Sequence, residues 1–143
     1  MHELPRQLSA GELVPLFSGR TRLVDELAQR EHPLEVAEEV ALALAEGDQV
    51  AALATHPRIG EPSEEQRGAE PEVLAELERL IAEYEHRFGF SFVVFVHGRT
   101  RAELVPVLRQ RLLRTRAEEL EAGLRALCEI ARARWELGWT RTT

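Results

Sequence analysis

One short segment of the chain brings together side chains that can carry protons and hydrogen-bond a ligand. It opens with His56, in the run His-Pro-Arg-Ile-Gly, and continues to Ser63, Glu65 and Gln66. An imidazole changes protonation state near neutral pH, a carboxylate accepts hydrogen bonds, and an amide both donates and accepts them. This combination suits acid–base chemistry on a small polar ligand, and it predicts a functional loop.

Each of these residues also has a purely structural interpretation. Ser63 and Gln66 have the spacing of a helix capping box, in which Glu65 would be an acid of the first helical turn. His56 precedes a proline, which disfavours helix at the residue before it, so this histidine could simply end a helix. A zinc site formed by His56, Glu65 and His97 is a further alternative, which no clustered His/Cys motif supports.

A second unusual segment is the apolar run Phe-Val-Val-Phe-Val at residues 92–96, which is followed by His97 and Arg99. Consecutive β-branched and aromatic residues are typical of a buried strand. No second strand candidate exists to pair with this run, and buried backbone groups need hydrogen-bond partners. The run is therefore either helical, or extended and satisfied by side chains, a ligand or a second subunit. An extended backbone with free donors could clamp a ligand.

The composition excludes several classes of function. The chain has 143 residues and a net charge of -7, the wrong sign for a protein whose affinity depends on neutralising phosphates, so no nucleic acid partner is expected. All 18 basic residues are arginine, which excludes lysine-dependent chemistry such as Schiff-base formation. We expect no membrane segment, because no apolar run has the required length. A single cysteine, Cys128, and an N-terminus without a secretion signal predict a cytoplasmic protein.

Helix start and stop signals recur along the chain. Three capping boxes, in which serine or threonine precedes glutamate by three residues, begin at Ser9, Thr100 and Thr115. Prolines suited to a first helical position and glycine stops bound two more helices, over residues 33–47 and 71–89. We also expect a short helix over residues 21–30, one that Asp48 caps and that leads to His56, a bend or early end at Pro106, and a last helix ended by Gly138.

These features occur in an order that resembles a known family. The His-Pro-Arg-Ile-Gly run, Ser63 with the Glu65-Gln66 pair, Phe-Gly-Phe-Ser-Phe-Val-Val-Phe-Val-His-Gly-Arg-Thr-Arg-Ala-Glu-Leu at residues 88–104 and the closing helix together resemble the 2-oxo-4-hydroxy-4-carboxy-5-ureidoimidazoline (OHCU) decarboxylase family of urate breakdown, in its bacterial form. The resemblance spans nearly the whole chain. It implies an all-α fold, with residues 1–143 in one compact domain of about seven to nine helices, and helix or irregular chain for residues 92–96. It also implies a homodimer that uses no cofactor and no metal.

The implied reaction converts the anionic ureidoimidazoline to (S)-allantoin and carbon dioxide. Loss of carbon dioxide leaves an electron pair beside a ring imine and carbonyl, so the substrate carries its own electron sink and needs no lysine or cofactor. The resemblance makes His56 the proton carrier and Glu65 its catalytic partner in orienting the substrate. It also implies substrate contacts from Gln66, which would read the ureido or ring amide, and from Pro57, Ser63, Phe92, Val94, His97 and Arg99.

Two positions depart from the family's pattern. Many relatives carry arginine or lysine where this chain has His97, so either protonated His97 contacts the substrate anion or Arg99 reaches it instead. Ser63 lies one residue closer to the Glu-Gln pair than is usual, which leaves its alignment open. An alternative function from another class is a non-catalytic helical dimer that binds an anionic ureide-like metabolite.

Overall fold

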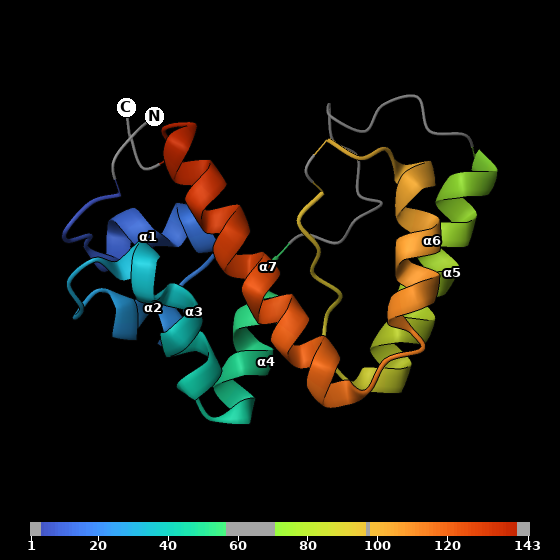
Figure 1. Ribbon diagram of the computed structural model, residues 1–143, viewed down its shortest axis with the longest axis horizontal. Helices are drawn as coiled ribbons and strands as arrows, with labels where there is room; N and C mark the ends of the chain where they lie inside the picture. Colours follow the sequence, from blue (N-terminus) through green and yellow to red (C-terminus); the bar gives the residue numbers. More distant parts are fainter. Residues whose placement is uncertain (1–3, 57–70, 97, 140–143) are drawn as a thin grey trace.

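The computed structural model describes residues 4–56, 71–96 and 98–139, and in these ranges it contains seven α-helices and no strand (Figure 1). The all-α fold expected from the resemblance is therefore confirmed. Four short helices form one side of the molecule, two helices that run side by side in the same direction form the other, and the last helix runs obliquely between them (Figure 1). In chain order the helices are α1 (Ala10–Phe17), α2 (Arg22–Leu27), α3 (Pro33–Ala43), α4 (Glu46–Ala54), α5 (Pro71–Phe88), α6 (Arg101–Arg111) and α7 (Arg116–Glu136).

Local signals explain several helix ends. All three predicted capping boxes form: the hydroxyls of Ser9, Thr100 and Thr115 each accept from the backbone N–H three residues on, and the glutamate there accepts from the cap's own N–H. Gly89 and Gly138 follow α5 and α7 with φ of 79° and 82°. Glycine adopts this left-handed conformation without steric cost, so both predicted stops are confirmed.

The predicted boundary between α3 and α4 was wrong. α3 ends at Ala43, and Gly47 lies in the first turn of α4 instead of stopping the preceding helix. The reason is a non-local contact, because the side-chain amide of Gln49 donates to the carbonyls of Ala41 and Leu42 at 3.0 and 3.3 Å. These bonds satisfy carbonyls at the end of α3, where a glycine turn would otherwise do so.

Two smaller expectations were also wrong. Asp48 does not cap α4, whose N-cap is Ala45; it lies in the first turn, where its charge complements the helix dipole. Pro106 does not end α6, which continues to Arg111. The neighbours of this proline on the inner face, Leu104 and Leu108, are fully buried, and such packing outweighs a local break in the backbone hydrogen bonds.

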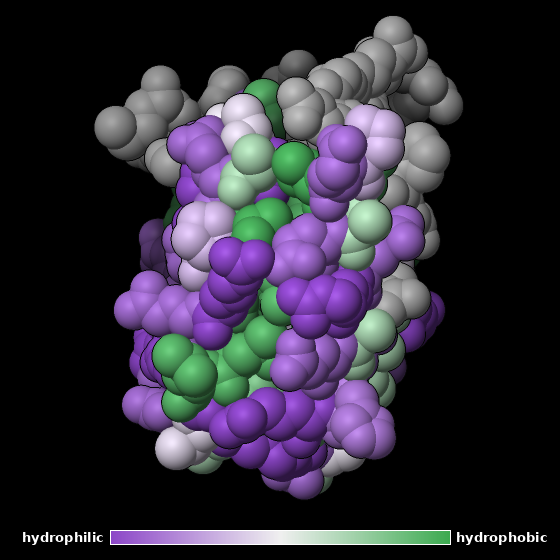
Figure 2. All heavy atoms as spheres, turned by 90° about the vertical axis from the view of Figure 1, so that its right-hand side faces the viewer, coloured by the Kyte–Doolittle hydropathy of each residue, from purple (hydrophilic) through white to green (hydrophobic). Residues whose placement is uncertain are grey.

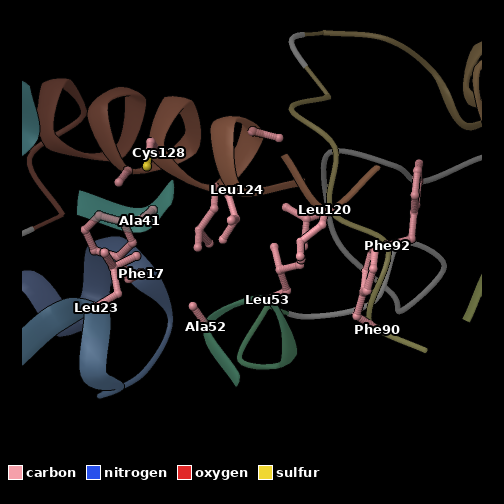
Figure 3. Packing of buried hydrophobic residues seen from close by; sticks show 14 of the residues in the cluster. Phe17, Leu23, Ala41, Ala52, Leu53, Phe90, Phe92, Leu120, Leu124 and Cys128 are labelled. Atoms are coloured by element: carbon pink, nitrogen blue, oxygen red, sulfur yellow. The ribbon is translucent and has the colours of Figure 1, made fainter. Parts of the chain in front are cut away.

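The core extends along α7 (Figure 3). Leu53 of α4 points toward Leu120 and Leu124 of α7, and a side chain at Gly123 would come within 3.2 Å of Leu53, so this glycine permits the close approach. Phe90 and Phe92, of the segment between α5 and α6, continue the core beyond Leu120. Cys128 is fully buried in α7, and burial raises the pKa of its thiol to about 12.

The α5–α6 pair forms the opposite side of the molecule. α5 packs along α6, whereas α1, α3 and α4 pack against α7. The outer face of the pair is largely hydrophilic, with a narrow band of apolar residues between charged side chains (Figure 2). None of the described helices is both long and apolar enough to cross a membrane.

The packing of α7 predicts a large effect at Leu124, whose side chain is fully buried. Leu124→Ala should lower the free energy of unfolding by about 3 kcal/mol, because it removes apolar contacts and leaves a cavity. Leu113→Ala is the matched control, since Leu113 is 82% exposed, and it should change stability by less than about 0.5 kcal/mol. Urea denaturation measures both, and equal effects would contradict this account of the core.

Candidate functional site

His56 lies at the junction of α4, α1 and α7. It directly follows the C-cap of α4, and its backbone N–H donates to the carbonyl of Leu53 at 3.3 Å. The neighbouring Thr55 hydroxyl donates to the carbonyls of Ala52 and Phe17 at 2.9 and 3.0 Å, which ties the end of α4 to the end of α1. Helix ends therefore fix the position of this histidine.

The surroundings of His56 favour its neutral form. Burial, and in second place the positive charge of Arg134, lower the pKa of the imidazole to about 4. Its Nε2 atom is inaccessible to solvent and has no hydrogen-bond partner among the described residues. His56 is therefore an unprotonated imidazole at neutral pH, able to accept a proton.

Arg134 of α7 is held beside this histidine by the end of α1. Its Nη1 donates to the carbonyls of Pro15 and Leu16, each at 3.2 Å, and to the Ser18 hydroxyl at 2.6 Å. Its guanidinium also lies 4.4 Å from the centroid of the Trp139 ring. The positive charge next to His56 is thus fixed by backbone acceptors.

The sequence analysis did not single out Arg134. A signal for it exists, because Leu127, Ala131 and Arg134 follow one another at the four- and three-residue spacing of a single helix face. The first two are fully buried, so an arginine that continues this stripe is directed toward the protein and not toward solvent.

Several predicted site residues lie outside the described residues. These are Pro57, Ser63, Glu65, Gln66 and His97. Their assignments stay predictions. The alternative zinc site depends on two of them, and among the described residues no group of three or more histidine, cysteine or acidic side chains could hold a metal ion.

The apolar run after α5 forms neither helix nor strand, and this irregular chain is one of the two conformations that the resemblance implied. Arginine side chains bind its carbonyls. Arg111 Nη1 donates to Val93 at 3.1 Å, and Arg99 donates through Nη2 to Phe95 at 2.7 Å and through Nε to Val96 at 3.1 Å. Side chains thus replace the missing partner strand, which was one of the alternatives that the sequence left open.

Two of the predicted substrate-binding residues line an open hollow between this run and α7. The hollow has a volume of about 520 Å³ and is bounded by Val94, Phe95, Arg99, Ala126 and Glu129. Its described lining does not include His56. α7 connects the hollow with the surroundings of His56. Glu129, which lines the hollow, and Arg134, which lies beside His56, are five residues apart, or about 8 Å along this helix.

The side chain of Phe92 does not contribute to this hollow. It is buried against Tyr84, with ring centroids 4.9 Å apart, and against the guanidinium of Arg111 at 4.7 Å. A contact between this residue and a ligand would therefore come from its backbone.

The fold and the site define an all-α protein with a half-buried, neutral histidine beside a fixed arginine. Residues 14–136 match the family described as OHCU decarboxylase. The chain belongs to this family, whose members are decarboxylating lyases.

Two solved structures share the fold. One is a crystal structure of OHCU decarboxylase in the presence of (S)-allantoin, with a TM-score of 0.77 and 21% sequence identity over 91% of this chain and 99% of that chain. The other is a crystal structure of (S)-allantoin synthase, with a TM-score of 0.72 and 18% identity over 91% of this chain and 49% of that chain. This chain thus spans about half the length of the second protein.

The lowered pKa of His56 predicts a pH dependence of stability. The unfolded chain binds a proton at this residue below its ordinary value of 6.5, whereas the folded chain does so only near 4, so stability falls as the pH decreases through this window. Between pH 7 and pH 5, denaturation of His56→Gln should show a smaller loss in the free energy of unfolding than denaturation of the wild type. His86→Gln, which changes an exposed histidine of α5, is the control, and a loss for His56→Gln as large as that of the wild type would contradict the assignment.

Proposed function

We propose that the protein decarboxylates OHCU to (S)-allantoin and carbon dioxide as a step of urate breakdown, without a cofactor. Membership of the family and the likeness to a structure obtained with (S)-allantoin support this proposal. The observation on this chain that carries it is the state of His56: half-buried, with an enclosed Nε2 atom, neutral and next to a fixed positive charge.

The neutral imidazole suits a reaction that needs one proton at carbon. When the carboxylate leaves as carbon dioxide, its electron pair stays on the ring carbon and a proton must be added there. In the free protein, burial and Arg134 keep His56 unprotonated. The negative charge of a bound substrate would favour the imidazolium, so His56 gains a proton in the complex and donates it to one face of the carbanion.

Arg134 is our proposed partner for the substrate carboxylate. Its charge already acts on His56, so an anion bound there would meet both groups. We thus assign to Arg134 of α7 the contact with the substrate anion that the sequence predicted for His97 or Arg99.

The remaining assignments complete the proposed site. Glu65 orients the substrate with His56, Gln66 reads its amide groups, and Pro57, Ser63 and His97 contribute further contacts. The backbone of Phe92 and Val94, and Arg99 in the wall of the hollow, would bound the ligand on the other side.

We further propose that the protein works as a cytoplasmic homodimer. The family resemblance supports the dimer, and an unpaired, buried cysteine suits a reducing compartment.

Replacement of His56 tests the proposed proton carrier. His56→Ala should lower kcat at least about 100-fold, the usual contribution of a positioned acid–base group. The assay follows ureidoimidazoline absorbance and the optical activity of the allantoin formed, with His86→Ala as the control. Equal rates and handedness for His56→Ala and the wild type would reject the role, and binding of substrate by the wild type without turnover would favour the non-catalytic alternative.

Replacement of Arg134 tests the anion site and the electrostatics together. Arg134→Gln should raise KM about 10-fold, since it removes a charge-assisted contact. It should also move the limb of the kcat/KM profile along which activity falls with rising pH to higher pH, because the positive charge that lowers the pKa of the proton donor His56 is lost. Arg132→Gln, which removes a neighbouring arginine bound to Glu38 and Leu34, should leave both quantities near wild type. An unchanged pH profile in Arg134→Gln would contradict the coupling.

A further inference from the structure

Arg111, at the end of α6, has no role in the chemistry proposed above, yet its side chain is almost completely enclosed. The residue is 9% exposed. Its Nε donates to Oε1 of Glu119 at 2.6 Å, its Nη1 donates to the carbonyl of Val93 at 3.1 Å, and its guanidinium lies 4.7 Å from the Phe92 ring centroid. One side chain thus joins the extended run to α7.

Glu119 holds this arginine in place. Its carboxylate is fully buried, accepts a hydrogen bond from the Tyr84 hydroxyl at 2.8 Å, and lies 3.4 Å from Arg114 Nη1. Tyr84 belongs to α5, Arg111 to α6 and Glu119 to α7, so three helices meet at one carboxylate. The guanidinium of Arg111 therefore has little freedom to move.

Stability alone does not explain such a group. Replacing a buried ion pair by apolar residues of similar volume is often neutral or stabilising, because charges lose hydration when they are buried. An apolar replacement could not donate a hydrogen bond to Val93, whose carbonyl lies in a segment without a partner strand. The charged group therefore performs a task that hydrophobic packing cannot.

Arg111 fixes the backbone next to the residues that line the hollow. Val93 directly precedes Val94 and Phe95, which line the hollow opposite Ala126 and Glu129 of α7. Val94 lines the hollow, and its backbone N–H donates to no described residue, which leaves this donor for a ligand in the hollow. Fixing the Val93 carbonyl fixes the plane of the Val93–Val94 peptide group, and with it the direction of the Val94 N–H.

We propose that Arg111 is a positioning residue for the substrate: held by Glu119 and Tyr84, it fixes the backbone of residues 92–94 in the conformation that meets the ureidoimidazoline. This inference rests on the proposed function for the identity of the ligand. Arg111 itself touches no reacting atom. Its loss should therefore weaken binding more than it slows the chemical step.

Arg111→Lys is the test variant, and Arg114→Lys is its matched control. Lysine keeps a positive charge beside Glu119 but lacks the planar fork that serves the carboxylate and the Val93 carbonyl together. Arg114 also pairs with Glu119 but does not contact the extended run. Arg111→Lys should raise KM about 3- to 10-fold, the effect of one lost hydrogen bond, with a smaller change in kcat. Arg114→Lys should leave both within about 2-fold of wild type.

The same variants are compared for (S)-allantoin binding by calorimetry, and the Kd of Arg111→Lys should rise in parallel with KM. An unchanged Kd and KM in folded Arg111→Lys, or an equal rise in Arg114→Lys, would overturn the proposal. If Arg111→Lys does not fold, Tyr84→Phe replaces it: this variant removes one donor to Glu119 but keeps the ring, and it should show a smaller rise, with no rise overturning the inference.

The two proposals fail differently in this experiment. A wild type that binds (S)-allantoin without decarboxylating OHCU defeats the proposed reaction, and the Kd values still decide the role of Arg111. A wild type that neither decarboxylates OHCU nor binds (S)-allantoin overturns both.

Discussion

The architecture depends on a single buried carboxylate. Glu119 receives hydrogen bonds from the Tyr84 hydroxyl of α5 and the Arg111 guanidinium of α6, and it belongs to α7, which packs on α1, α3 and α4. The α5–α6 pair is thereby attached to the rest of the molecule through polar contacts and through the phenylalanines of the extended run. The cation, the phenol and the carboxylate offset part of the cost that burying any one of them alone would carry, while Arg111 Nη2 and Glu119 Oε2 are buried without a hydrogen-bond partner among the described residues.

The fold offers a structural reason why the chain uses arginine and no lysine. Arg99, Arg111, Arg116 and Arg134 all donate to backbone carbonyls at places where helices end or where the chain is extended. A guanidinium can bind a carbonyl with one nitrogen while another meets a carboxylate, a hydroxyl or an aromatic ring, which an ammonium cannot do with the same fixed geometry. Irregular backbone is stabilised here by arginine side chains in place of neighbouring strands.

The helix ends that the sequence predicted correctly are set by contacts between residues that are close together in the chain. The capping boxes at Ser9, Thr100 and Thr115 depend on atoms three residues apart, so the sequence alone located them. The end of α3 could not be predicted in this way, because it depends on the side chain of Gln49 folding back from the next helix. Likewise His56 was found through a motif, whereas Arg134 acts on it only because the fold brings residues 78 positions apart in the sequence together.

The reactivity of Cys128 reports on the opening of the native structure. Thiol reagents and peroxides react with the thiolate, and the enclosed sulfur of α7 is a poor source of it because its pKa is raised to about 12. Modification of this atom therefore requires that the helices around it separate first. The rate of alkylation of Cys128 would then measure how often the native state opens, and no reporter group would have to be introduced into the protein.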